Sequence, residues 1–534
     1  MAKTDPADQN ASAPVNYTIE LLESMAARGD RDAVVLGSER ITYREACDLV
    51  LRLSRALRDA DMGPGKVLGM FTANRPEALL LQIAAHFTGC RLVFVPPEPG
   101  DSELAAFVQR AGVDLLVFDP AFEERVERIT GRVHVPMLFS LGKAHLGWNL
   151  LDALAFEADL TPADAADAAH VSTLFYTGGT TGRPKLVVHK GRYYDVVSPL
   201  AERCADGAPD PKFLVATLLT HTSGHLGALA GLRGGFTILL MEGFDGGAAL
   251  SLMERERVTT MVLVPPMLYE ILDDPACATA RTDTLRRIFY TGAATAPARL
   301  RAAIERFGPV MHQFYGTTEA AVITDLAREE HDLARPRTLE SCGRPLPGVE
   351  VELRNGGSVV TGPGSVGEIH VCSDMVMSGY WNDLERSEEV LQDGWYRTGD
   401  LAYRDEEGYL YLVDRAKDII VTGRTSDNVY SRLLDDFLCT LPEIRLAAAI
   451  GVPDEAYGEA VHVYLVPRPN TSLDLDDVRR RVVEELGGLY EPKSFSIVDA
   501  LPTTAVGKID KAALRRRFAL RTGDETGDEL DPVR

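Results

Sequence analysis

The 534-residue chain has few of the signatures that assign a sequence to a class at once. Its seven cysteines are scattered and none forms C-x-x-C, so neither a disulfide framework nor a zinc module is indicated. No uncharged apolar run approaches the ~20 residues that span a bilayer. Acidic residues outnumber basic ones, 79 to 56, and the net charge of −23 argues against non-specific nucleic-acid binding.

The amino terminus lacks a secretory signal, because residues 1–16 are polar and contain no apolar core. We therefore expect a cytoplasmic protein whose residues 1–16 are disordered. The length predicts more than one domain, and the 45% hydrophobic content is ample for large cores. The last residues, 519–534, are predicted to form an acidic tail.

The hydrophobic pattern of the first part of the chain predicts alternating helices and strands. Residues 17–58 have apolar side chains at helical spacing. Strands are expected at 67–71, 92–95 and 114–118, with helices between them. This alternation is typical of a parallel sheet with helices on both faces.

The pattern changes after residue 340. Residues 340–400 contain short β-like runs divided by Gly, Pro and Asn, which predicts a small, barrel-like β subdomain. Beyond about residue 415 the helix and strand candidates indicate a separate α+β domain. We therefore expect a large domain over 17–414 and a smaller one over 415–518.

A glycine-rich loop follows an apolar strand candidate at 171–175 and reads YTGGTTGRPK over residues 176–185. Its backbone N–H groups, hydroxyls and two cations suit a polyphosphate. It is not a Walker A loop, because Arg183 and Pro184 separate the last glycine from the lysine. An ordinary turn between strands is the alternative. The candidate phosphate contacts are Thr177, Gly178, Gly179, Thr180, Thr181, Gly182 and Lys185.

A second motif, YGTTE over residues 315–319, follows a strand candidate at 310–314. Tyr315 offers a stacking face, Gly316 permits close approach, Thr317 and Thr318 offer hydroxyls, and Glu319 is a hard oxygen ligand for Mg²⁺. The alternative is a helix amino terminus with Thr and Glu as capping residues. That alternative does not account for the preceding Tyr and Gly.

Three further positions are weaker candidates. The small-residue loop Gly292, Ala293 and Ala294 could pack against a flat base. Asp400, after WYRTG, offers two carboxylate oxygens to the hydroxyls of a ribose. His221 and His225 are four apart, but without H-E-x-x-H or a nearby third ligand they do not predict a metal site.

These motifs resemble those of the adenylate-forming superfamily, which includes acyl-CoA synthetases, peptide-synthetase adenylation domains and luciferases. The segment PTTAVGKID at 502–510 resembles the family's carboxy-terminal signature. The resemblance covers about 20–518. It implies an α/β fold, with a large domain of two doubly wound sheets and a β-barrel subdomain, followed by a mobile α+β domain.

The resemblance also implies roles for individual residues. Adenine would lie against the 292–294 loop and Tyr315, with Arg415 on the ribose. His221 would line the acyl pocket, and Lys417 would be the hinge about which the small domain turns. Lys508 would bridge the substrate carboxylate and the α-phosphate.

The implied reaction joins a carboxylic acid to ATP with Mg²⁺, forming an acyl-AMP and pyrophosphate. The thiol of CoA then takes the acyl group. The acyl pocket is expected between residues 221–230, 292–295 and 314–316, and the frequent glycine and alanine in these segments favour a bulky aliphatic, polycyclic or aryl acid. Two alternatives stay open, namely an adenylation enzyme that loads a carrier-protein phosphopantetheine and a non-catalytic nucleotide-binding relative. A serine hydrolase is disfavoured, because G-x-S-x-G is absent.

The chain departs from the family's pattern around the hinge. Asp414 replaces a usual glycine, Arg424 replaces a second glycine, Ser431 replaces a proline and Leu433 replaces a glutamate. The segment after Gly423 also holds about two extra residues. We therefore hypothesise that one of the two half-reactions is weakened, either adenylation or the transfer from acyl-AMP.

Overall fold

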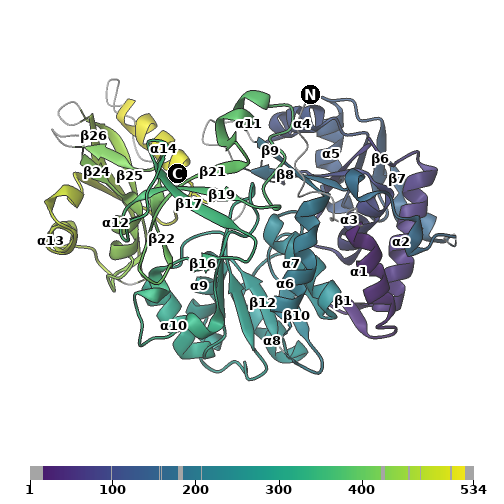
Figure 1. Ribbon diagram of the computed structural model, residues 1–534, viewed down its shortest axis with the longest axis horizontal. Helices are drawn as coiled ribbons and strands as arrows, with labels where there is room; N and C mark the ends of the chain where they lie inside the picture. Colours follow the sequence, from purple (N-terminus) through teal and green to yellow (C-terminus); the bar gives the residue numbers. More distant parts are fainter. Residues whose placement is uncertain are drawn as a thin grey trace, which may run out of the picture.

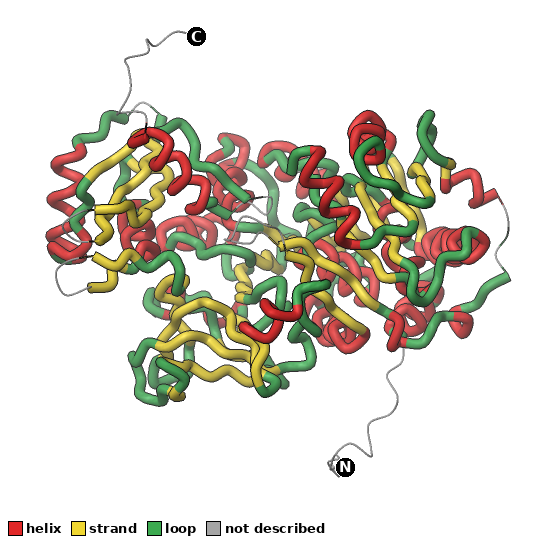
Figure 2. The backbone as a smooth tube through the Cα atoms, turned by 90° about the horizontal axis from the view of Figure 1, so that it is seen from above, coloured by secondary structure: helices red, strands yellow, loops and turns green. Residues whose placement is uncertain are grey.

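The computed structural model describes residues 16–523 apart from 98, 156, 158, 178–184, 206, 423–426, 455–457, 470 and 505–507. The chain forms a large α/β domain, a β subdomain and a smaller carboxy-terminal domain (Figure 1). Figure 2 shows the β subdomain and the carboxy-terminal domain as separate groups of strands beside the large domain. Within these residues no helix is long and apolar enough to cross a bilayer.

The first sheet has seven strands in the order β7-β6-β5-β3-β4-β8-β9. All neighbours in it are parallel except β8 and β9. The runs VLGMF and LLVF are buried on both faces, which is the pattern of central parallel strands. The strands are β3 (Val67–Phe71), β4 (Arg91–Phe94), β5 (Leu115–Phe118), β6 (Met137–Ser140), β7 (Trp148–Asn149), β8 (Ser172–Thr177) and β9 (Lys185–Lys190).

The second sheet has nine strands in the order β16-β15-β14-β13-β12-β10-β11-β1-β2, with a parallel centre and antiparallel strands at both edges. Its strands are β1 (Asp32–Leu36), β2 (Glu39–Thr42), β10 (Lys212–Val215), β11 (Thr237–Leu240), β12 (Thr260–Leu263), β13 (Arg287–Tyr290), β14 (Met311–Tyr315), β15 (Thr324–Leu326) and β16 (Arg344–Pro345).

Helices separate and cover the two sheets. The middle layer between the sheets buries the largest apolar cluster, and α3 is buried along nearly its whole length. Its helices are α1 (Tyr17–Ala26), α2 (Tyr43–Asp59), α3 (Pro76–Thr88), α6 (Val197–Cys204) and α7 (Thr222–Gly234). The outer faces are covered by α4 (Asp101–Ala111) and α5 (Glu123–Thr130) on the first sheet, and by α8 (Gly246–Glu256), α9 (Pro265–Asp273) and α10 (Pro297–Phe307) on the second.

The β subdomain is an antiparallel six-stranded sheet in the order β18-β17-β19-β21-β20, with β22 also paired to β21. The described pairings are those of an open sheet, so the expected barrel closure is not seen. Its elements are β17 (Glu350–Asn355), β18 (Ser358–Val359), β19 (Gly367–Cys372), α11 (Leu384–Val390), β20 (Leu391–Gln392), β21 (Trp395–Arg404) and β22 (Leu410–Arg415).

The carboxy-terminal domain packs helices on both faces of a three-stranded sheet, as its α+β pattern predicted. A two-stranded sheet, β23 (Ile420–Thr422) and β24 (Asp427–Val429), precedes it. The remaining elements are α12 (Ser431–Leu438), β25 (Ile444–Asp454), β26 (Gly458–Pro467), α13 (Leu475–Leu486), β27 (Ser494–Ile497) and α14 (Lys511–Gly523).

Three boundaries differ from those expected. Residues 17–58 are not helical throughout, because the strands β1 and β2 interrupt them and form one edge of the second sheet. Asn16 is not disordered, since it is buried and its side chain caps α1. The helix α14 continues past residue 518 to Gly523, so the first residues of the segment assigned to the tail are helical.

A chain of buried hydrogen bonds ties the middle layer to the first sheet. The hydroxyl of Tyr17 lies 2.8 Å from Nδ1 of His86, and Nε2 of His86 lies 2.8 Å from the hydroxyl of Thr173. The Thr173 hydroxyl is 2.5 Å from that of Tyr194, in the short helix Gly191–Val196. Burial lowers the pKa of His86 to about 3, so this imidazole is neutral.

The same chain continues to α7 through a second histidine. Nε2 of His225 lies 3.1 Å from the Tyr194 hydroxyl, and its Nδ1 lies 2.7 Å from Oε1 of Gln82. Because Oε1 can only accept, Nδ1 of His225 carries the proton, and Tyr194 must donate to Nε2. Each hydrogen bond in this network then has a defined donor and a defined acceptor. The network is fully satisfied, which favours a single packing of α1, α3 and α7.

We predict that Tyr194→Phe lowers the thermal unfolding midpoint, because it removes the acceptor of the Thr173 hydroxyl proton and the donor to Nε2 of His225. Each orphaned group costs about 1–3 kcal/mol. Tyr193→Phe is the matched control, since the buried Tyr193 hydroxyl has no partner among the described residues. Scanning fluorimetry should show a lower midpoint for the first variant alone. Equal midpoints for the two variants would contradict the network's role.

Candidate active site

A cleft of about 1970 Å³ lies where the large domain, the β subdomain and the carboxy-terminal domain meet. Every described residue that the sequence motifs singled out lines it. These residues are Thr177, Lys185, His221, Gly292, Ala293, Ala294, Tyr315, Gly316, Thr317, Thr318, Glu319, Asp400, Arg415, Lys417 and Lys508. Five other candidates, Gly178, Gly179, Thr180, Thr181 and Gly182, lie outside the described residues, as does the segment 423–426 that holds Arg424.

Asp400 is the centre of one group in the cleft. It lies in β21, is 6% exposed, and accepts a hydrogen bond of 2.8 Å from the Tyr315 hydroxyl at the end of β14. Nε of Arg415, at the end of β22, lies 2.9 Å from its other oxygen. Asp400 raises the pKa of the Arg415 guanidinium. An ionised carboxylate has about four acceptor positions, so both oxygens retain capacity for ribose hydroxyls.

Glu319 and Lys185 are joined by a tyrosine that the sequence motifs did not identify. The Tyr380 hydroxyl donates to Oε1 of Glu319 at 2.9 Å, and Nζ of Lys185 lies 3.3 Å from the same hydroxyl. The ammonium also lies 4.5 Å from the centre of the Tyr380 ring. The SGYW segment around Tyr380 was assigned to a β-like run. Nothing in its local pattern indicated that it returns to β9, where Tyr380 bridges Val187.

A second unpredicted residue, His189 in β9, holds the YGTTE turn. Its Nε2 donates to the carbonyl of Thr318 at 2.6 Å, and its ring stacks on Tyr193 at 3.9 Å between centroids. Burial lowers the pKa of His189 to about 4. The turn is also closely packed, since a Cβ at Gly316 would lie 1.7 Å from the carbonyl oxygen of Ala321. Only glycine fits there.

His221 lies at the start of α7, on a loop held by the side chains of Asn74, which precedes α3, and Gln82, which lies in α3. Asn74 accepts from the N–H of Leu219 at 2.8 Å, and Gln82 donates to its carbonyl at 3.3 Å. The first turn of α7 approaches this loop so closely that a Cβ at Gly224 would lie 2.1 Å from the carbonyl oxygen of Leu218. The hydrogen-bonded core of the middle layer thus positions His221.

The His221 imidazole is neutral near pH 7. Burial and, to a smaller extent, the Lys508 ammonium lower its pKa to about 4. Its Nδ1 lies 3.2 Å from the Ser223 hydroxyl. A neutral imidazole in a cleft can accept a proton or line an apolar pocket. Among the described residues, no group of three or more His, Cys, Asp or Glu side chains is placed to hold a metal ion.

Beyond His221 the cleft is apolar. Its walls there come from a buried face of the second sheet and from α6 and α7, with small side chains between aromatic ones. The lining residues on this side include Cys204, Phe213, Leu226, Gly227, Ala230, Val262, Phe289 and Phe314. The sequence favoured 221–230, 292–295 and 314–316 as pocket segments. It did not indicate the aromatic contributions of Phe213 and Phe289, which come from the interiors of β10 and β13.

Lys508 enters the cleft from the carboxy-terminal domain. The N–H of Thr504 donates to the carbonyl of Lys508 at 2.7 Å. Burial, with smaller contributions from Arg415 and Lys417, lowers the pKa of the Lys508 ammonium to about 8. Asp400 and Glu319 act in the opposite sense. The lysine therefore lies in the mixed-charge environment between the two domains.

Comparison with known proteins identifies relatives over nearly the whole chain. Residues 21–381 match the model of the AMP-binding enzyme family, and residues 434–508 match that of the AMP-binding enzyme carboxy-terminal domain. The chain is 33% identical to the medium/long-chain-fatty-acid–CoA ligase FadD8 of Mycobacterium tuberculosis, over 99% of this chain and 94% of that protein. It is 35% identical to feruloyl-CoA synthase of Amycolatopsis sp, over 91% and 96%.

A solved structure is equally similar. The amide bond synthetase McbA from Marinactinospora thermotolerans superposes with a TM-score of 0.84 and 35% identity. The match covers 94% of this chain and all of the other. The relatives thus include proteins named as a CoA ligase, a CoA synthase and an amide bond synthetase.

We predict that the Lys508 amine becomes reactive toward an acylating reagent as the pH rises through about 8. Burial disfavours the charged form, so the neutral, nucleophilic amine appears below the pH of a free lysine, whose pKa is about 10.4. Competitive labelling followed by mass spectrometry measures this titration. In the denatured chain the same lysine should titrate near its ordinary pKa. A folded-state titration near 10.4 would show that the lysine is not desolvated.

Proposed function

The chain belongs to the AMP-binding enzyme family, in the acyl-CoA ligase branch of the adenylate-forming enzymes, and from this premise we propose which residues carry each part of the reaction. It is an AMP-forming acid–thiol ligase that activates a carboxylic acid with ATP and transfers the acyl group to the thiol of CoA. The observation that carries the residue assignment is the convergence of Lys508, Arg415, Asp400 and Glu319 on one cleft.

In the first half-reaction, a carboxylate oxygen of the substrate attacks the α-phosphorus of ATP. The new bond is that of the acyl phosphate anhydride, and the bond from phosphorus to the bridging oxygen of pyrophosphate breaks. No proton is transferred, so the protein must stabilise negative charge on the phosphoryl oxygens. Lys508 is suited to this, because its ammonium can contact both the carboxylate and the α-phosphate.

The nucleotide would be held by groups already paired in the structure. Tyr315 and the loop 292–294 offer surfaces for adenine. Asp400 accepts from the ribose hydroxyls, and the ion pair with Arg415 orients that carboxylate. Lys185 lies on the pyrophosphate side, after the loop 178–184. Tyr380 holds the Lys185 ammonium and the Glu319 carboxylate in a fixed relation.

A magnesium ion fits this donor set, since Glu319 offers a hard carboxylate oxygen and Mg²⁺ commonly takes one or two protein carboxylates with substrate phosphates and water. When bound, the ion would neutralise charge on the departing pyrophosphate. Tyr380 donates to Oε1 of Glu319 and leaves Oε2 available. The protein's own contribution is to hold the carboxylate and Lys185 on the same side of the phosphates.

In the second half-reaction, the sulfur of CoA attacks the acyl carbon, AMP leaves with the bonding electrons, and the thiol proton is released. We propose that the small domain turns at Lys417 to expose this face. A carrier-protein thiol is the alternative acceptor. The apolar chamber beyond His221 supports a carboxylic acid with a bulky aliphatic or aryl group.

Acyl transfer to an amine is a second candidate function, favoured by the 35% identity to an amide bond synthetase. The nitrogen of an amine would attack the acyl carbon of the acyl-AMP, AMP would leave, and one amine proton would have to be removed. The neutral His221 is suited to accept that proton. Offering CoA and a set of primary amines to the acyl-AMP formed in place would rank the two acceptors.

We predict that Lys508→Ala lowers the rate of ATP–pyrophosphate exchange by about 10²–10³-fold, because a positioned cation at the phosphoryl group is lost. Thioester formation from a supplied acyl-AMP should change only a few-fold. Lys493→Ala is the control, since Lys493 is an exposed lysine of the same domain that pairs with Asp454. A similar loss in both half-reactions, or in neither, would contradict the role given to Lys508.

The acid specificity is tested with a panel of carboxylic acids scored by pyrophosphate exchange. Aryl and medium-chain aliphatic acids should be activated well ahead of acetate, because only they fill the apolar chamber. A preference for acetate or for an α-amino acid would overturn the substrate proposal. Loss of exchange with every acid would count against ATP-dependent activation itself.

A further inference from the structure

Asp414 lies three residues before the proposed hinge, Lys417. It contacts Ser431 and Arg432, which lie on the other side of that hinge. It belongs to β22 of the β subdomain and is 7% exposed. One carboxylate oxygen accepts from the N–H of Arg415 at 2.7 Å. The other accepts from the Ser431 hydroxyl at 2.9 Å and from the N–H of Arg432 at 3.3 Å. The large and small domains are thus joined directly across Lys417.

The contact gives α12 a cap from outside its own domain. Within the described residues, Tyr430 at the N-cap position provides no side-chain cap. The first turn of a helix leaves unpaired N–H groups and carries partial positive charge, so an anion there is stabilising. Asp414 provides that anion from β22, on which α12 packs (Figure 1).

Ser431 passes the connection on to the segment that carries Lys508. Its side chain is fully buried, and its oxygen accepts from Nζ of Lys511 at 2.7 Å. The Lys511 ammonium also pairs with Asp435 at 2.6 Å. Lys511 begins α14, three residues after Lys508. A continuous set of polar contacts therefore runs from Asp414, in the strand before the hinge, through Ser431 to Lys511.

These contacts restrict the hinge. Ser431 and Arg432 move with the small domain, whereas Asp414 stays with the large one. A rotation at Lys417 that withdraws Lys508 must separate Asp414 from both donors. The buried carboxylate would then have to find other partners or water.

We propose that Asp414, Ser431 and Lys511 are positioning residues that hold the small domain in the orientation that places Lys508 in the cleft. They bias the enzyme toward adenylate formation and slow the change of orientation that acyl transfer to a thiol requires. The inference rests on the proposed two-step function and assigns the biased half-reaction to specific residues. Helix caps of this kind change an equilibrium about two- to thirtyfold.

The test combines a distance measurement with the two half-reaction assays on the full-length protein. Spin labels on the outer surfaces of the two domains report their orientation by pulsed dipolar spectroscopy. Asp414→Ala should reduce the population with the present orientation about tenfold, slow pyrophosphate exchange, and speed thioester formation from supplied acyl-AMP. Asp414→Asn keeps a weaker acceptor and should give an intermediate value for all three quantities.

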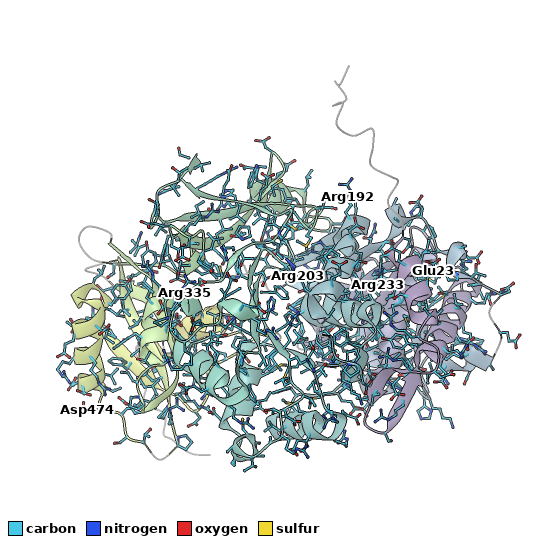
Figure 3. The ribbon with its side chains drawn as sticks, turned by 60° about the horizontal axis from the view of Figure 1, so that its bottom comes forward. Glu23, Arg192, Arg203, Arg233, Arg335 and Asp474 are labelled. Atoms are coloured by element: carbon cyan, nitrogen blue, oxygen red, sulfur yellow. The ribbon has the colours of Figure 1, made fainter. Side chains whose placement is uncertain are left out.

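Two further variants separate positioning from stability. Ser431→Ala should shift the same quantities, and the Asp414→Ala, Ser431→Ala double variant should show less than the sum of the single effects, because the residues act through one contact. Asp474→Ala is the matched control. Asp474 caps α13 within the small domain, on its side away from the large domain (Figure 3), and its loss should lower stability without shifting orientation.

The outcomes distinguish this inference from the function on which it rests. Equal slowing of both half-reactions by Asp414→Ala, an unchanged distance distribution, or the same shift in Asp474→Ala would overturn the positioning role. If the wild-type protein performed neither half-reaction with any acid, the proposed function would fail. The distance measurement would still show whether Asp414 holds the two domains together.

Discussion

The burial of the Lys508 ammonium between two domains is the constraint on which the rest of the site depends. Removing a cation from water is costly, and here it lowers the pKa of the amine to about 8. Asp400 and Glu319 offset part of that cost, while Arg415 and Lys417 add positive charge. The cleft thus gathers cations on a protein whose net charge is −23. A polyphosphate is the ligand that best satisfies such a local field.

The residues of the cleft other than Lys508 come from separate elements of the fold. Tyr315 and Glu319 come from the end of β14 and the turn after it, Asp400 from β21, and Lys185 from β9. Their positions are fixed by contacts behind them, such as Tyr380 against Glu319 and the buried polar chain beneath His221. The same elements therefore set both the stability of the middle layer and the precision of the site.

The residues of the YGTTE turn and the carboxylate of Asp400 indicated a nucleotide site by their own chemistry, whereas Lys508 was predicted only from the resemblance to the family signature. The structure places all of these residues on one cleft. Tyr380 and His189 were not identified, because their importance arises only from contacts between distant parts of the sequence. Tyr380 bridges Val187 in β9, and His189 in β9 contacts the carbonyl of Thr318. The strands β1 and β2 were missed for a similar reason, since their place at the edge of the second sheet depends on pairing with β11. Asp414 and Ser431 were noted as two separate features of the sequence, and only the structure shows that their side chains are in contact.

A crystal structure with an acyl-sulfamoyl adenosine, a stable analogue of the acyl-adenylate, tests the central claim most directly. The account predicts the adenine against Tyr315 and the 292–294 loop, the ribose hydroxyls on Asp400, and the Lys508 ammonium within hydrogen-bond distance of the sulfamoyl group. Density for the analogue outside this cleft, or a Lys508 side chain directed into solvent while the analogue is bound, would contradict it.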